Sequence, residues 1–197
     1  MVTRIRPVRT SLTLAVATVA LALPAGGAHA EDLAPPHQAL LLLRILAYDR
    51  ALGARAGDRV TVAVVYRDAD KRARTLADEM ATSLSSIAQK ATVAKLPVRV
   101  ALIPHDAGTF EQKLGELRPA AVYVAGGLEG ALEAITRATR RFRALSFASD
   151  ARVVERGVSV GLLAHDARAR LVINLASARA EGADLDAALL RLAEVNR

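Results

Sequence analysis

Residues that could bind a small polar ligand follow directly on the ends of three apolar segments. They are Tyr66, Arg67, His105, Gly126 and Gly127. If those segments are parallel strands, the residues share the edge of the sheet at which α/β proteins bind ligands. The two glycines also open a predicted helix, whose free N–H groups could hold an anion. A second interpretation stays open, because glycines serve tight turns, and Asp68 and Asp106 nearby are common turn formers and helix caps.

Four arginines form the densest basic cluster in the chain, close to the end of a helix predicted over residues 128–139. They are Arg137, Arg140, Arg141 and Arg143. Cations at the carboxyl end of a helix stabilise it through the helix dipole, which explains the cluster without a partner. The same residues could instead dock onto an acidic protein surface or onto lipid headgroups. Both interpretations stay open at this point.

Catalytic chemistry finds little support in the sequence. The chain has no cysteine, which excludes disulfides, thiol nucleophiles and iron–sulfur sites. The histidines after residue 30 are His37, His105 and His165, which lack the close spacing of helical zinc motifs. No serine lies in a Gly-x-Ser-x-Gly elbow. We therefore predict no catalytic residue, metal or cofactor, and an enzyme that uses acids at the strand ends ranks last among the alternatives.

Residues 1–30 have the three parts of a secretory signal peptide. Three arginines form a basic start, residues 11–23 are uncharged and apolar, and a small-x-small pattern ends at Ala30. The apolar run has about 13 residues, whereas a membrane-spanning helix needs about 20. We predict cleavage after Ala30 and a mature protein in the periplasm. An uncleaved membrane anchor is the alternative.

The charge of the mature chain argues against nucleic acid as a partner. The whole sequence has a formal charge of +7, and residues 1–30 contribute three arginines and no acid, which leaves +4. Only three Phe and three Tyr are present, with no Trp, so few rings could stack on bases. A protein or a small molecule is the better-supported class of partner.

The elements that must position these residues alternate in type. Apolar runs at residues 60–65, 98–103, 120–125 and 144–148 predict buried parallel strands, and amphipathic segments between them predict helices. The clearest helix ends near residue 88, with Asp68 or Asp70 as its cap. Strands that alternate with helices indicate right-handed βαβ units.

The end of the chain follows a different pattern. Apolar runs at residues 157–164 and 168–175, joined by a turn at 165–167, predict a β-hairpin. A last helix is expected after Asp184, with Leu192 among its inward-facing residues. We therefore expect one α/β domain over residues 31–197, with a three-layer, mostly parallel sheet of Rossmann or flavodoxin type, a C-terminal hairpin and a terminal helix.

The last third of the chain resembles the closing signature of the YfiR/HmsC-like family. The similar segments are a strand at residues 157–162, the sequence RLVINLASAR at 170–179 and the sequence ALLRLA at 188–193. The order of signal peptide, apolar helix, strand and helix at the start of the chain also fits. Within the signature, Asn174 ends a strand, and its side chain can bond nearby backbone.

The resemblance implies a periplasmic α/β protein that represses a membrane-bound diguanylate cyclase by contacting its periplasmic sensor part. Such proteins restrain cyclic-di-GMP signalling and biofilm formation, and they tend to form dimers. The chain departs from the family pattern in two ways. It lacks the cysteines that form disulfides in relatives, so redox sensing through a disulfide is not carried over. The sequence YDRAL at residues 48–52 replaces the aromatic segment that usually follows the first helix.

We therefore predict a periplasmic regulatory binding protein that contacts a membrane signalling protein and catalyses no reaction. A homodimer is an open possibility, and nucleic acid is not an expected partner. The alternative is a periplasmic small-ligand-binding protein similar to a transport substrate-binding component, with its ligand at the strand ends. A single domain lacks the second lobe of such components, which counts against that alternative.

Overall fold

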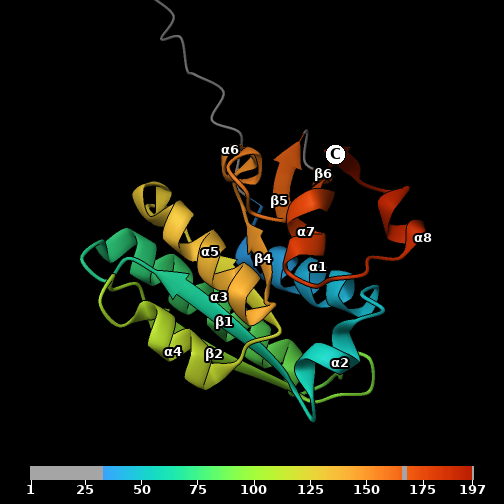
Figure 1. Cartoon of the computed structure of the whole chain (residues 1–197), viewed down its shortest axis with the longest axis horizontal. Helices are drawn as coiled ribbons and strands as arrows, with labels where there is room; N and C mark the ends of the chain where they lie inside the picture. The colour runs from blue at the N-terminus through green and yellow to red at the C-terminus, as the bar shows by residue number, and fades with distance from the viewer. Residues whose placement is uncertain (1–32, 166–167, 197) are drawn as a thin grey trace, which may run out of the picture.

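Seven strands form one sheet in the order β2-β1-β3-β4-β5-β6-β7 (Figure 1). The computed structural model describes residues 33–165 and 168–196. The strands are β1 (Val60–Tyr66), β2 (Val98–Pro104), β3 (Ala121–Val124), β4 (Leu145–Ala148), β5 (Val160–His165), β6 (Arg168–Asn174) and β7 (Glu194–Asn196). Strands β1 to β5 are parallel, β6 is antiparallel to β5, and β7 is parallel to β6. The predicted mostly parallel α/β fold is confirmed.

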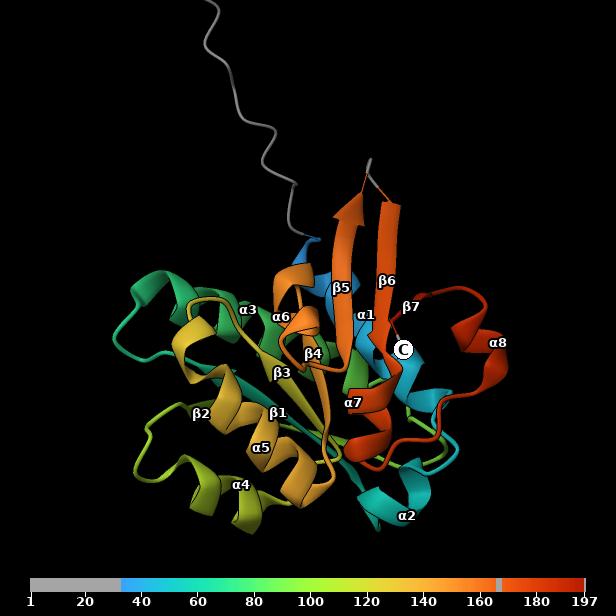
Figure 2. The same cartoon turned by 45° about the horizontal axis from the view of Figure 1, so that its top comes forward.

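Helices cover both faces of this sheet (Figures 1 and 2). They are α1 (Pro35–Ala47), α2 (Leu52–Ala56), α3 (Lys71–Ala88), α4 (Phe110–Leu117), α5 (Leu132–Phe142), α6 (Ala151–Glu155), α7 (Leu175–Ala180) and α8 (Ala187–Leu190), with the short 3-10 helix η1 (Glu129–Ala131) before α5. No helix in the described part of the chain is long and apolar enough to cross a bilayer. The predicted signal peptide lies outside the described residues.

Strand β1 shows why the fold has three layers. Val62 and Val64 belong to the core that contains α1 and α3, whereas Ala63 and Val65 belong to the core that contains α4 and α5. Successive side chains of a strand point to opposite faces, so a strand between two helical layers is expected to be apolar on both faces, as β1 is apart from Thr61. All seven residues of β1 are buried accordingly.

Helix α3 begins at the second of its two predicted caps. The Asp70 carboxylate accepts hydrogen bonds from the N–H groups of Arg72 (2.9 Å) and Ala73 (3.1 Å), which satisfies two free donors of the first turn. Asp68 instead forms an exposed ion pair with Arg74 (3.2 Å). The N-terminus of α3 is thereby fixed directly beside the carboxyl end of β1.

The C-terminal hairpin forms as predicted, and Figure 2 shows β5 and β6 extending together beyond the rest of the sheet. Its expected turn includes residues 166 and 167, which lie outside the described residues. Asn174 confirms its expected role, because its side chain accepts from the Ser177 N–H (3.0 Å) and donates to the Val154 carbonyl (3.2 Å). These two bonds join the start of α7 to α6.

A terminal helix forms as predicted, but Asp184 as its cap and Leu192 as an inward-facing residue are wrong. Helix α8 covers only Ala187–Leu190, and its cap is Asp186, which accepts from the Ala188 N–H (2.7 Å). The Asp184 side chain instead pairs with Arg50 (3.0 Å), and its N–H donates to the buried Asp49 carboxylate (2.8 Å). Leu192 is 79% exposed instead of inward-facing. The following residues add β7 to the free edge of β6, which satisfies backbone groups that a helix would have satisfied internally.

Candidate functional site

The five residues predicted at the strand ends share one edge of the sheet, but their side chains do not converge. The His105 N–H donates to the Tyr66 carbonyl (2.8 Å), which joins the ends of β2 and β1. The Tyr66 side chain lies in the core with α1 and α3, whereas the His105 ring packs on Phe110 of α4, with centroids 5.0 Å apart. The two rings therefore lie on opposite faces of the sheet. Arg67 is exposed to solvent.

His105 has the environment of a neutral packing residue. Burial lowers its pKa below the usual value, and the positive charge of Arg67 lowers it further, against an opposing effect of Asp106. Its Nε2 atom is buried without a hydrogen-bond partner among the described residues. Asp106 accepts from the Gly108 N–H (3.0 Å) and the Thr109 hydroxyl (3.2 Å), as expected of a turn former.

The glycine pair after β3 forms a tight turn against the start of α3. Gly127 has a φ of +82°, and a Cβ atom there would lie 3.4 Å from the Asp70 carboxylate. Its N–H faces the side chain of Glu129 (3.3 Å). The cavity beside the turn measures about 30 Å³, and Glu129 and Asp150 both line it. That volume suits a water molecule rather than a polar ligand of several atoms.

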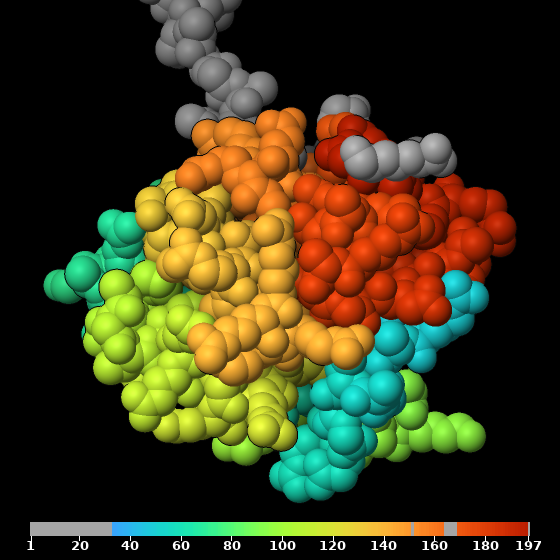
Figure 3. All heavy atoms as spheres, in the orientation of Figure 1, coloured from blue at the N-terminus to red at the C-terminus, as the bar shows by residue number. Residues whose placement is uncertain are grey.

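The four arginines of the predicted cluster lie on α5 and at its end, and all four are exposed. Figure 3 shows the segment of α5 at the surface, between those of α4 and α7. Arg137 pairs with Glu133 (2.8 Å), and Arg141 pairs with Glu111 and lies over the Phe142 ring. Arg140 and Arg143 form no ion pair with any described residue.

Both of these unpaired arginines pack against backbone. A guanidinium nitrogen of Arg140 lies 3.2 Å from where a Cβ atom of Gly157 would be. The Nε atom of Arg143 lies 2.5 Å from the corresponding position at Gly182. Helix α5 therefore presents two cations whose charge is not neutralised by a carboxylate, beside two that are paired.

A buried acid that sequence reasoning missed ties α5 to the sheet. Glu181, at the end of α7, is fully buried, and its Oε1 atom accepts from the hydroxyls of Thr139 (2.6 Å) and Ser146 (2.7 Å). Its Oε2 atom accepts from the Ser146 N–H (2.8 Å) and the Ser159 hydroxyl (2.5 Å). Burial raises the pKa of Glu181 above the usual value, although these hydrogen bonds oppose the rise.

A buried ion pair holds the carboxyl end of α5 from the other side. Asp49 and Arg55 form the pair, and their side chains are 0% and 3% exposed. The Arg55 Nη1 atom also donates to the carbonyls of Ala120 and Arg143, each at 2.7 Å. This pair lies within and beside the segment at residues 48–52, where the chain departs from the family pattern. The departure therefore has a structural role, because it anchors the carboxyl end of α5 to β3 and α2.

The described residues contain no group of three His, Asp or Glu side chains placed to hold a metal ion. The features that remain are the exposed surface of α5 and a groove beside β2. Neither has the enclosed pocket with converging polar groups that is typical of an active site.

A family model described as YfiR/HmsC-like matches residues 38–194 of the chain. A search of curated proteins finds no match. Among solved structures, a conserved domain protein from Vibrio cholerae aligns with 18% identity and a TM-score of 0.59, covering 84% of this chain and 61% of that one.

An ABC domain in complex with L-Trp from Streptococcus pneumonia aligns with 12% identity and a TM-score of 0.56, covering 82% of this chain and 60% of that one. A ligand-free, open substrate binding protein with adhesive properties from Clostridium difficile aligns with 12% identity and a TM-score of 0.53, covering 75% and 57%. The chain thus spans about three fifths of the length of each of these structures. At such identities the similarity establishes the α/β fold alone.

Proposed function

Since this chain belongs to the YfiR/HmsC-like family, we propose that it modulates a membrane signalling protein of the diguanylate cyclase type by direct contact in the periplasm. The match over residues 38–194 is the observation that carries this proposal, because it covers nearly the whole described fold. The family is periplasmic and acts in cyclic-di-GMP signalling, with regulatory rather than catalytic members. A regulator of this kind would work by binding one state of its partner more tightly than the other.

The surface of α5 is the contact that the geometry best supports. Arg140 and Arg143 carry charges that no described carboxylate neutralises, so an acidic patch on the partner would gain two ion pairs without breaking any. The helix is held rigidly, because Thr139 bonds to Glu181 and the Arg143 carbonyl bonds to Arg55. A rigid presentation lowers the entropic cost of docking, and exposed charges mainly raise the rate of association.

The alternative, a small-ligand-binding protein, has weaker support. Its predicted ligand residues at the strand ends turn to different faces of the sheet, and the cavity beside them has about 30 Å³. The chain spans about three fifths of the length of the substrate-binding structures that it resembles. The described residues alone therefore offer no second lobe to enclose a ligand.

Crosslinking in the periplasm of the host tests the proposal. The bait is the wild-type protein, and mass spectrometry identifies the captured proteins. We expect a membrane protein with a periplasmic sensor part and a cyclase domain. Deleting the gene should change the cellular cyclic-di-GMP level, with a rise indicating repression and a fall indicating activation. Failure to recover such a membrane protein, together with an unchanged cyclic-di-GMP level, would refute the regulatory function.

A charge-reversal pair tests the contact surface separately. The double variant Arg140→Glu and Arg143→Glu should weaken capture of the partner. The matched control Arg72→Glu and Lys90→Glu makes the same change in net charge at exposed sites on and just after α3. Thermal unfolding must show that both doubles remain folded. Equal loss of capture in both doubles would indicate a general charge effect, and no loss in either would place the contact away from α5.

A further inference from the structure

Strand β2 is an outer strand of the sheet, and β1 is its only neighbour among the described residues. Only Ile103 of its seven residues is buried, in contrast to the completely buried β1. Leu102 is 41% exposed, although its neighbours in sequence are apolar. Natural proteins usually protect such an edge with charged side chains, bulges or a covering segment, because its backbone can pair with another strand.

The hydrogen bonds to β1 show which backbone groups of β2 face outward. The Val60 N–H donates to the Pro97 carbonyl (2.9 Å), and the His105 N–H donates to the Tyr66 carbonyl (2.8 Å). Odd-numbered residues of this segment therefore face β1. Because backbone direction alternates along a strand, the even-numbered residues turn their N–H and C=O groups away from the sheet. These are Val98, Val100 and Leu102, followed by Pro104, which has no N–H to offer.

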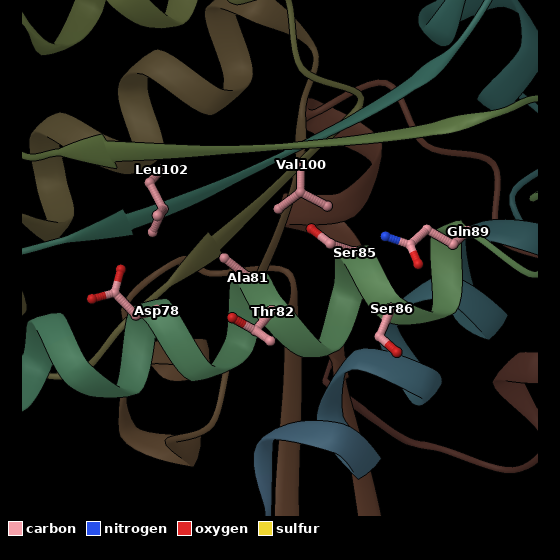
Figure 4. Close-up of a pocket in the computed structure, with 8 residues that line it drawn as sticks. All are labelled: Asp78, Ala81, Thr82, Ser85, Ser86, Gln89, Val100 and Leu102. Carbon is pink, nitrogen blue, oxygen red and sulfur yellow. The ribbon is translucent and has the colours of Figure 1, made fainter.

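A groove lies along this open edge, on the side of the sheet that α3 covers (Figure 4). Its volume is about 570 Å³. Val100 and Leu102 form the strand side, and in Figure 4 both point toward α3. The helix side is polar apart from Ala81, and its other lining residues are Asp78, Thr82, Ser85, Ser86 and Gln89. The same two apolar residues thus line the groove and turn their backbone groups outward.

We propose that an extended segment of another protein pairs with β2 as an additional strand and places alternate side chains in this groove. The outward backbone groups of Val98, Val100 and Leu102 would supply the main-chain hydrogen bonds, and the groove would select the side chains. Apolar residues fit opposite Val100 and Leu102. Asp78 is the only charged residue that lines the groove, and it forms no ion pair with a described residue. It therefore favours a lysine or arginine at one end of the segment.

This surface is distinct from α5, which packs against the other face of the sheet. The inference can therefore fail without affecting the proposed function, and the reverse also holds. A second copy of this chain is the competing occupant, because an antiparallel β2–β2 contact would use the same backbone groups. The measurement below separates the two occupants.

Fluorescence anisotropy with a designed peptide tests the inference on the purified chain from residue 31. The probe is a labelled peptide of alternating valine and threonine with a lysine at one end. The control peptide has the same sequence with N-methyl groups on alternate amides, which removes hydrogen-bond donors from one edge. We expect saturable binding of the probe, weakened at least about tenfold by methylation, since several main-chain hydrogen bonds are lost. Equal binding of both peptides, or no binding of the probe, would overturn the proposal.

Two variants locate the binding. Leu102→Lys adds a cation to the open edge and should abolish binding of the probe. Arg99→Gln changes an exposed residue whose side chain lies on the other face of β2, and it should leave binding unchanged. Sedimentation velocity identifies the competing occupant. The proposal is wrong if three results occur together: the wild type self-associates, Leu102→Lys makes it monomeric, and the peptide does not bind. A second copy of the chain would then occupy the edge.

Discussion

Replacing Glu181 by glutamine tests whether this buried side chain is held chiefly as the neutral acid. An amide nitrogen in the place of Oε1 can donate to the hydroxyls of Thr139 and Ser146, because hydroxyl groups rotate to accept. The amide oxygen in the place of Oε2 keeps the bonds from the Ser146 N–H and the Ser159 hydroxyl. The variant Glu181→Gln should therefore fold with unchanged packing while losing the titratable group.

The expected signature is a pH dependence of the difference in stability. Burial raises the pKa of Glu181, so the folded state binds the proton more tightly than the unfolded chain does. Stability from this group is complete below the unfolded pKa of about 4.3 and is lost as the pH rises through the higher folded pKa. Wild type should lose stability relative to the variant as the pH rises above about 4, by about 1.4 kcal/mol for each tenfold difference in proton affinity between the folded and unfolded states.

Urea unfolding followed by circular dichroism at several pH values measures this difference. Other groups titrate equally in both proteins, so the difference isolates Glu181. A third variant, Glu181→Ala, leaves the Ser146 N–H without its acceptor and should cost about 2–4 kcal/mol even at neutral pH. A difference between wild type and Glu181→Gln that is independent of pH, or that favours wild type as the pH rises, would refute the reasoning. A difference independent of pH would mean that folding does not shift the pKa of Glu181. A difference that favours wild type as the pH rises would mean that the charged carboxylate is preferred.

Two further predictions concern the ion pair and the glycine turn. Arg55→Met leaves a buried carboxylate without its partner and should lower the free energy of unfolding by about 3–5 kcal/mol. Arg50→Met removes an exposed ion pair and should cost less than about 1 kcal/mol in the same urea titration, so equal losses would contradict the assigned burial. Gly127→Ala should lower the melting temperature, because φ is +82° and the Asp70 carboxylate is 3.4 Å from the added carbon. Gly126→Ala has no atom within 4 Å and should leave the melting temperature nearly unchanged, and the opposite order would exclude the turn geometry.

The central strands could be predicted because their signal is local. Strand β1 is apolar at every position except Thr61, and this pattern follows directly from burial between two layers of helices. The last helix could not be predicted in the same way. Residues near Leu192 have a helical pattern, but the open edge of β6 offers hydrogen bonds to the residues that become β7. That edge exists only after the sheet has assembled, so no local sequence pattern predicts strand β7.

For the candidate site too, the local features could be predicted from the sequence and the long-range contacts could not. The sequence predicted which loops share an edge, and the hydrogen bond between His105 and Tyr66 confirms that the ends of β2 and β1 meet. The direction of a side chain depends on the pleat of the sheet, and the side chains of Tyr66 and His105 point to opposite faces. The partners of Glu181 are 42, 35 and 22 residues away in sequence, so only the assembled fold reveals that cluster. One signal was present, since Ser146 and Ser159 lie in otherwise apolar segments.

The bond between the Asp184 N–H and the Asp49 carboxylate spans 135 positions and has a consequence for the timing of folding. Asp184, the partner of the segment that follows the first helix, is synthesised 135 positions later than Asp49. Contacts between residues so far apart in sequence form late and slow the folding reaction. The Asp49 carboxylate therefore stays partly hydrated until Asp184 is available. For a chain with the predicted export signal, this delay would keep the polypeptide loose enough to thread through a translocation pore.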